Sequence, residues 1–494
     1  MRRKALAAVA ILAIVAVASF SVYELYYTGG SSPCGAIPGG SEARVQTTET
    51  QFGAVTEYQL PGADRYPNAI VNASDGSVWF AEDELPGVAH LFPNNGTVVE
   101  YAWPNYPTPQ PPDCISSASA SGIALWQGRV WAADEYSNSI LGVNPAGGST
   151  VVINTTAKAD YPYWLAVGPD GDLWFTSDNA PAKIGRIAPN MSMQVISLSG
   201  TGEDEPLTLA FVNSTLAYIS SVNLSGPTPA SCYCNGHIYS FDPSNLSETI
   251  TPTVVGSGYN LTLPTDATFL DGSVWVPQHD ASNLVKYDVD KGTWTTYPTS
   301  TVSYSLVTLA LETAAQDGKI WFNEHYANKI GEIDPAANTL VEYSESNPPI
   351  TNDTQIQNDV SIAVANGGVW FTSQTGNYVG FANGSYNPGW RVTPGGEDSA
   401  TVLPGGNASF TVGVSGSWQT PLGVSVSDSE NLTSTPRLIR VTPSAASVAA
   451  GGTTYSLVVT VAVGTAVRPG VYTVAVTLTG GLTQQSAYFF IDVT

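Results

Sequence analysis

Residues 319–335 read Lys-Ile-Trp-Phe-Asn-Glu-His-Tyr-Ala-Asn-Lys-Ile-Gly-Glu-Ile-Asp-Pro, and variants of this stretch recur along the chain. The pattern predicts two short strands joined by a tight link, with an aromatic anchor in the first. The anchors of the seven copies are Trp79, Trp131, Trp174, Tyr218, Trp275, Trp321 and Trp370. Their spacing of 43 to 57 residues is typical of a β-propeller, in which each repeat forms one blade.

Each repeat predicts the same order of strands. A first strand leads through a turn to the anchor strand, a third ends near Asp-Pro or Asn-Pro, and a fourth, exposed strand rich in Thr and Tyr completes the blade. The first turn is marked by Asp-Gly at residues 75–76, 170–171, 271–272 and 317–318. Asp-Gly between apolar alternations favours a hairpin.

The last repeat has no fourth strand of its own. A matching segment, residues 54–61, stands ahead of the first repeat. We therefore expect residues 51–391 to form a seven-bladed propeller in which this N-terminal strand closes the last blade and leaves no open edge in the ring.

The ends of the chain differ from the propeller in composition. Residues 1–27 combine a basic start with an uncharged apolar run from 5 to 22, which predicts a signal peptide or a membrane-anchor helix. The basic start should stay inside, which places the rest of the chain outside. Residues 28–50, rich in Gly, Ser and Pro, predict a linker.

The C-terminal part, residues 392–494, predicts a second β domain. Its segments alternate apolar and polar residues with period two between Gly and Pro turns, as in a β-sandwich. Pro-Gly-Val-Tyr-Thr-Val at 469–474 resembles the immunoglobulin-like modules of prokaryotic surface proteins. Such a module favours a role as spacer, adhesion or docking unit.

Composition fits an exported protein. Lys and Arg number 17 against 41 Asp and Glu, a net charge of −24, so nothing would neutralise nucleic-acid phosphates and we exclude that class of partner. N-glycosylation sequons are dense. They lie at Asn72, Asn95, Asn154, Asn190, Asn213, Asn223, Asn245, Asn260, Asn352, Asn383, Asn407 and Asn431. We expect an extracellular glycoprotein, secreted or held at the outer face of the membrane by its N-terminal segment, with cell-envelope proteins or glycans as partners.

The cysteines are Cys34, Cys114, Cys232 and Cys234. In an exported chain we expect disulfides, and pairing the first two and the last two is one of three arrangements that the sequence leaves open. The last two lie with His237 in an insertion, residues 223–237, which makes a metal-binding trio the alternative.

Proline-led first strands, Trp-Phe-x-Glu at 321–324 and Asn-Lys-Ile-Gly at 328–331 resemble the repeats of the virginiamycin B lyase-like (streptogramin lyase) family. The resemblance implies a propeller over residues 51–391. The lyase of that family opens a cyclic depsipeptide by elimination, using a His after the proline of a first strand, nearby Glu residues and a magnesium ion.

That histidine position holds other residues in this chain, namely Asn68, Tyr163, Leu207 and Thr265. The histidines are His90, His237, His279 and His325. Because elimination needs a positioned base, the sequence favours a binding or structural module over an enzyme. The alternative is a lyase or hydrolase at the propeller mouth, with Glu324 and His325 as candidate catalytic residues.

Equivalent positions three residues after each anchor predict a site at the ring mouth. They are Glu82, Asp134, Ser177, Ser221, Gln278, Glu324 and Ser373. Repeat symmetry would bring their carboxylates toward one axis. The candidate ligand-binding residues are Glu82, Asp134, Gln278 and Glu324, and the three acids are also candidate ligands of a divalent cation, which prefers oxygen donors. The competing interpretation is that they are solvated strand ends.

Overall fold

The computed structural model describes residues 42–62, 65–83, 87–104, 120–135, 137–156, 159, 161–223, 236–259, 261–279, 281–300, 310–345, 358–429 and 438–494. Every helix or strand in these ranges is a strand, which confirms the all-β prediction. None of the described segments is an apolar helix long enough to cross a membrane. The segment 1–27, the four cysteines, and the sequons at Asn260, Asn352 and Asn431 lie outside the described residues.

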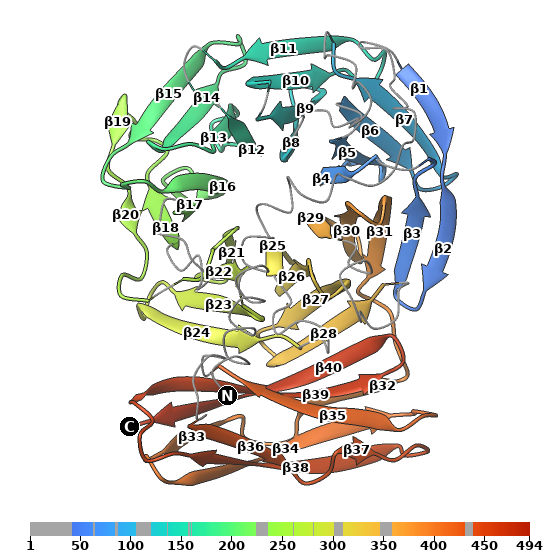
Figure 1. The fold of residues 1–494 in the computed structure, drawn as a ribbon, viewed down its shortest axis with the longest axis vertical. Coiled ribbons are helices and arrows are strands. Elements are labelled where there is room, and N and C mark those ends of the chain that lie inside the picture. Colours follow the sequence, from blue (N-terminus) through green and yellow to red (C-terminus); the bar gives the residue numbers. More distant parts are fainter. Residues whose placement is uncertain are drawn as a thin grey trace, which may run out of the picture.

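Each anchor aromatic belongs to one sheet. These sheets are arranged in a ring in which the first strand of each repeat is innermost (Figure 1). The first sheet has β4 (Pro67–Asn72), β5 (Val78–Glu82), β6 (Gly87–Phe92), β7 (Thr97–Ala102) and β1 (Glu42–Gln46). The second has β8 (Gly122–Trp126), β9 (Arg129–Asp134), β10 (Ser139–Val143) and β11 (Thr150–Asn154). The third has β12 (Pro162–Val167), β13 (Leu173–Ser177), β14 (Lys183–Ile187), β15 (Met193–Leu198) and, in parallel, β19 (Thr249–Ile250).

The remaining sheets of the ring follow the same order. The fourth has β16 (Glu205–Asn213), β17 (Leu216–Val222), β18 (Gly236–Phe241) and β20 (Thr253–Val254). The fifth has β21 (Thr268–Leu270), β22 (Ser273–Gln278), β23 (Asn283–Asp288) and β24 (Thr293–Pro298). The sixth begins with β25 (Ala310–Gln316), β26 (Lys319–Glu324), β27 (Lys329–Asp334) and β28 (Thr339–Ser344). The last has β29 (Asp359–Ala365), β30 (Gly368–Ser373), β31 (Tyr378–Asn383), β3 (Val55–Gln59) and β2 (Thr48–Phe52).

Each anchor aromatic is buried on the second strand of its sheet, in a cluster with apolar residues of the following sheet. Trp79 clusters with Val130 of the second sheet, and Trp370 of the last sheet clusters with Phe80 of the first. Truncating a buried Trp to Ala costs about 3–5 kcal/mol in typical cores. The anchors therefore join neighbouring sheets around the whole ring.

The Trp-Phe and Ile-Gly motifs depend on each other. Phe322 of β26 lies directly opposite Gly331 of β27, and Phe371 opposite Gly380. A Cβ on Gly331 would lie 2.1 Å from the ring of Phe322, so only glycine leaves room for it.

The residue two places after the anchor links adjacent sheets where it can form hydrogen bonds. Thr176 Oγ1 donates to the Leu207 carbonyl of the next sheet at 2.6 Å, and Thr372 Oγ1 donates to that of Asn68 at 2.6 Å. Asn323 Nδ2 reaches the Asp359 carbonyl at 2.7 Å. In the first two repeats Ala stands at this position, so these side chains cannot form the link.

The N-terminal segment joins the last sheet to the first. Residues Val55–Gln59 pair with β31, and Glu42–Gln46 pair with β7. The expectation that residues 28–50 are only a linker is therefore wrong for their described part. Those strands form because open sheet edges accept them, a tertiary effect that local composition does not encode. For the same reason β7, expected to be exposed, pairs with β1 along its outer edge and is largely buried.

Residues after β31 form two packed sheets around their own core. One sheet has β32 (Trp390–Pro394), β34 (Asn407–Gly416), β38 (Thr454–Val463) and β36 (Ile439–Pro443). The other has β33 (Ser399–Val402), β40 (Thr483–Val493), β39 (Gly470–Gly480), β35 (Leu422–Asp428) and β37 (Ser447–Val448). The immunoglobulin-like classification stays a prediction.

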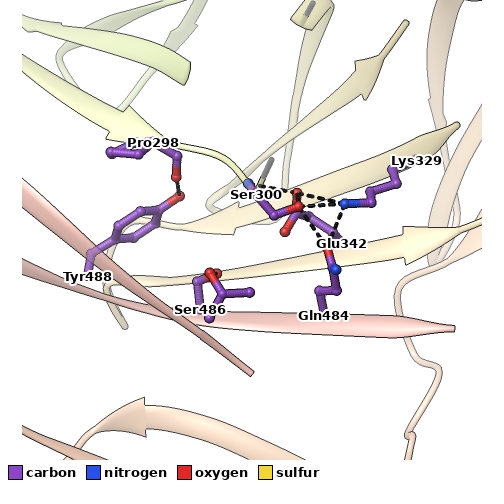
Figure 2. Close-up of polar contacts among 8 residues, drawn as sticks. Pro298, Ser300, Lys329, Glu342, Gln484, Ser486 and Tyr488 are labelled. Atoms are coloured by element: carbon purple, nitrogen blue, oxygen red, sulfur yellow. Dashed lines mark hydrogen bonds and ion pairs between the residues drawn. The ribbon is translucent and has the colours of Figure 1, made fainter. Parts of the chain in front are cut away.

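The second of these sheets continues the sixth blade. Strand β28 pairs with β40, so Glu342 lies opposite Gln484 and a single sheet runs from the ring into the sandwich. Figure 2 shows the polar contacts at this seam, where Lys329 Nζ donates to Ser300 Oγ and Gln484 Oε1, both at 2.5 Å. Tyr488 donates to the Pro298 carbonyl at 2.9 Å. This pairing buries β28, which the sequence predicted to be exposed.

Candidate functional site

The positions three residues after the anchors are interior positions. All seven side chains are buried, with Asp134 and Glu324 at 0% exposure, so the interpretation as solvated strand ends is wrong. They lie at the end of the second strand of each sheet, or one residue before it in the case of Ser221, and this strand is one strand away from the axis.

Each predicted ligand residue has partners within its own repeat. Glu82 Oε1 lies 3.9 Å from Arg65 Nε. The same nitrogen donates a hydrogen bond to Glu100 Oε1 at 2.7 Å. Burial and the neighbouring Glu100 raise the pKa of Glu82 well above its usual value. Gln278 Oε1 accepts from the Thr262 amide at 3.0 Å.

Glu324 repeats this arrangement in the sixth sheet. Its pKa is raised well above the usual value by burial and then by Glu342, with Lys329 opposing the shift. Glu324 and Glu82 are thus each coupled to the fourth-strand carboxyl of their own sheet.

The predicted divalent-cation site does not form. In the described ranges no three His, Cys, Asp or Glu residues are placed to hold a metal ion. Glu82, Asp134 and Glu324 therefore do not fit the magnesium ion that the family resemblance implies. The alternative metal-binding trio of Cys232, Cys234 and His237 stays a prediction, because both cysteines lie outside the described residues.

The residues four places after the anchors meet across sheet boundaries instead. Asp83 Oδ2 accepts from Gln374 Nε2 of the last sheet at 3.0 Å and from Asn68 Nδ2 at 3.1 Å. The rings of His279 and His325, the same position in the fifth and sixth sheets, lie 5.8 Å apart. Asn68 follows a first-strand proline, so the family's histidine position adjoins this set.

Tyr163 occupies the histidine position of the third repeat and lies within electrostatic reach of acidic groups from several repeats. We call Glu135, Asp178, Asp266 and Glu312 the acidic collar. Burial raises the pKa of Tyr163 well above its usual value, and all four collar residues add to the shift. These residues come from the second, third, fifth and sixth repeats, so Tyr163 lies where the repeats converge.

Burial raises the pKa of three of the collar carboxyls, Asp178, Asp266 and Glu312. The pKa of Asp178 is raised to about 7 by burial and by Glu205, and that of Glu312 to about 8 by burial and by Asp266. Part of the collar also supports the fold, since Glu312 Oε2 accepts from the Ile362 amide at 2.9 Å. Near neutral pH the collar offers both protonated and charged carboxyl groups, which suit hydroxyl-rich or cationic ligands.

His325 is poorly suited to act as a base. Its Nδ1 lies 3.3 Å from the Asp359 carbonyl, and burial, followed by His279, lowers its pKa to about 3. The neighbouring Glu324 is fully buried. The structure thus places the two candidate catalytic residues in neighbouring but different environments.

Most of the described sequon asparagines are on the surface. The exposed ones are Asn95, Asn154, Asn190, Asn213, Asn245, Asn383 and Asn407, while Asn72 and Asn223 are half-buried. In several, the asparagine oxygen accepts from the amide two residues on, as in Asn95, Asn190 and Asn383, each at 2.9 Å. These bonds form turns that leave the side-chain nitrogen for other contacts.

Comparison with known proteins agrees with the repeat analysis. Residues 40–220 match the Virginiamycin B lyase family. This confirms the family resemblance for the first three repeats and for the fourth repeat as far as residue 220, within β17. No curated protein matches the chain.

Solved structures give distant likenesses. The PQQ-bound aldose sugar dehydrogenase of Streptomyces coelicolor is 13% identical, with 58% of this chain and 94% of that chain covered and a TM-score of 0.36. A family 123 glycoside hydrolase of Clostridium perfringens is 12% identical over 22% of this chain and 27% of its own, with a TM-score of 0.16.

Proposed function

We propose that this chain is an exported, N-glycosylated surface protein whose propeller binds a polar ligand at the convergence of its repeats. The observation that carries the binding role is the acidic collar around Tyr163. A phenol among carboxyl groups of mixed protonation can donate and accept hydrogen bonds to several hydroxyl groups at once. Cell-envelope glycans are ligands of that chemistry.

Binding is favoured over catalysis by the residues in the family's histidine position. Asn68 and Tyr163 stand there, and the high pKa of Tyr163 makes it a poor base near neutral pH. The pKa of His325, about 3, also lies far from the value that proton transfer at neutral pH requires. A lyase or hydrolase at the mouth remains the alternative, with less support.

Glycan-array binding of the full chain tests the binding role. Tyr163→Phe and Asp178→Asn should each weaken binding about tenfold or more, because a hydrogen bond to a charged group contributes about 1.5–3 kcal/mol. The matched control is Asp290→Asn, since Asp290 is exposed. Equal binding by all four proteins, or no glycan bound by the parent, would refute a glycan site at the collar.

The surface location is supported by the exposed sequons. Protein purified from its natural host should lose mass on chemical deglycosylation. Site mapping should then place glycans on exposed positions such as Asn190 and Asn245. A native mass equal to that of the bare polypeptide would refute export into a glycosylating compartment.

A further inference from the structure

Three carboxyl groups meet where the N-terminal strand closes the ring. Glu57 lies on β3, Asp359 begins β29, and Glu345 follows β28 in the connection from the sixth sheet to the last. All three are buried, with Glu345 and Asp359 at 0% exposure. We call them the carboxyl clasp.

The clasp touches most of the last sheet. Tyr378, which begins β31, donates a hydrogen bond from its hydroxyl to Glu345 Oε2. Glu57 on β3 lies opposite Gly380 of that same strand. Asp359 on β29 pairs with Ser373 of β30. The clasp residues thus lie on the closing strand, on the first strand of the last sheet and beside Tyr378, the first residue of the strand that β3 joins.

Negative charge is the main electrostatic feature of the clasp. The pKa of Glu345 and the pKa of Asp359 each respond to the other carboxyl and to Glu57. The pKa of Tyr378 responds to all three carboxyls. The adjoining ring is His325, which faces the Asp359 carbonyl and is neutral above pH 3 to 4 because its pKa is about 3. Among the described residues, the groups that shift the pKa values of Glu345 and Asp359 most strongly include no lysine or arginine.

We propose that the carboxyl clasp is a proton-dependent lock on the ring, which holds β3 in the last sheet while Glu345 and Asp359 are protonated and loosens when these two groups ionise. Adjacent buried charges of one sign repel, and ionised Glu345 and Asp359 would also lose hydration without a nearby lysine or arginine among the groups that act most strongly on them. A protonated carboxyl avoids both penalties.

The direction of the effect follows from proton linkage. Burial, followed by the neighbouring carboxyls, raises the pKa of Asp359 well above its usual value, while the pKa of Glu345 is raised from 4.5 to about 7. The folded state therefore binds more protons than the unfolded state between these values. The stabilisation is complete below about pH 4.5 and is lost as pH rises through 7. This predicts a protein whose ring is closed most firmly in acid.

Hydrogen–deuterium exchange of the full chain tests the lock directly. After correction for intrinsic rates, amides of β3 and β31 should exchange at least about tenfold faster at pH 8 than at pH 5, since one pKa unit corresponds to a tenfold change in equilibrium. Strands β17 and β18 of the fourth sheet, on the opposite side of the ring, should change less.

Neutral variants separate the lock from a general effect of pH. Asp359→Asn and Glu345→Gln imitate protonated carboxyls and should keep β3 protected at pH 8, with less change in melting temperature between pH 5 and 8. Glu248→Gln, at an exposed acid, should behave as the parent.

Two results would overturn the proposal. One is equal protection of β3 in the parent at both pH values, a measurement that requires no variant. The other is a folded Glu345→Gln protein with the parent's full pH dependence. Neither result bears on ligand binding at the collar, so the two proposals fail independently.

Discussion

Thr372 shows how one hydroxyl can couple two sheets. Its Oγ1 donates to the carbonyl of Asn68, the second residue of β4 in the first sheet, and both residues are buried. Thr176 makes the corresponding bond between the third and fourth sheets. The polar residue two places after the anchor therefore has a structural role. In sequence it is adjacent to the predicted site residue, which is three places after the anchor.

Removing this hydroxyl should destabilise the ring measurably. Thr372→Val keeps the side-chain shape but leaves the Asn68 carbonyl without this donor, which should lower the free energy of unfolding by about 1–3 kcal/mol in a denaturant titration. Thr393→Val, at an exposed position of β32, is the control and should change the free energy of unfolding by less than about 0.5 kcal/mol. Equal effects of the two variants would contradict an inter-sheet role.

The chain should not carry out the elimination reaction of the lyase family that it resembles. Streptogramin B offered with magnesium should show no ring opening above buffer by mass spectrometry, because Tyr163 and His325 have pKa values far from neutrality. Glu324→Gln and His325→Ala should behave as the parent. Turnover by the parent that disappears in either variant would establish the enzyme alternative.

The residues that meet across sheet boundaries lie one place after the positions that the sequence singled out, for a geometric reason. Strand side chains alternate between faces, so residues two and four places after an anchor face the next sheet with it. Asp83 and His325 therefore meet neighbouring sheets, while Glu82 and Glu324 face carboxyls of their own sheets. Alternation alone could have suggested this shift, but the long-range approach of Glu312 or Asp266 to Tyr163 has no local signal in the sequence.

At the scale of strands, the repeat carried most of the prediction. Asp271-Gly272 and Asp317-Gly318 have positive φ at both residues, the conformation that Asp-Gly hairpins adopt. Phe322 and Gly331 likewise lie opposite each other because the Trp-Phe and Ile-Gly motifs stand on paired strands. Strands β1 and β2 lack such a motif and gain their partners only from the folded ring, so the sequence did not predict them.

Deleting the closing strand should destabilise the ring far more than deleting part of the preceding segment. Loss of residues 51–61 removes buried Tyr58 and Leu60 and uncovers the edge of β31, at a cost on the order of 5 kcal/mol or more. A deletion of residues 28–39 is the control. Equal melting temperatures for the two deletions would contradict closure by this segment.

For the whole molecule, continuity of the sheet from β25 to β39 means that the sandwich is structurally joined to the propeller. The ring of Tyr488 on β40 meets that of Tyr297 on β24 at 5.1 Å, and its hydroxyl bonds the Pro298 carbonyl. Composition predicted the second domain from its change of pattern near Trp390. It did not predict the seam, because edge pairing depends on two distant strands with compatible exposed backbones.

Two buried aromatics of the C-terminal part can test this coupling. Tyr488→Ala and Phe410→Ala each remove a large buried side chain, and each should cost about 3–5 kcal/mol. Phe410 packs on Phe489 inside the sandwich core, whereas Tyr488 clusters with Trp275 and Phe322 of the propeller. Under native conditions, Tyr488→Ala should therefore accelerate hydrogen exchange in β24 and β28, while Phe410→Ala should accelerate it mainly in β34 and β38. If both variants leave β24 and β28 as protected as in the parent, the sandwich is an independent unit and the continuous sheet does not transmit stability to the ring.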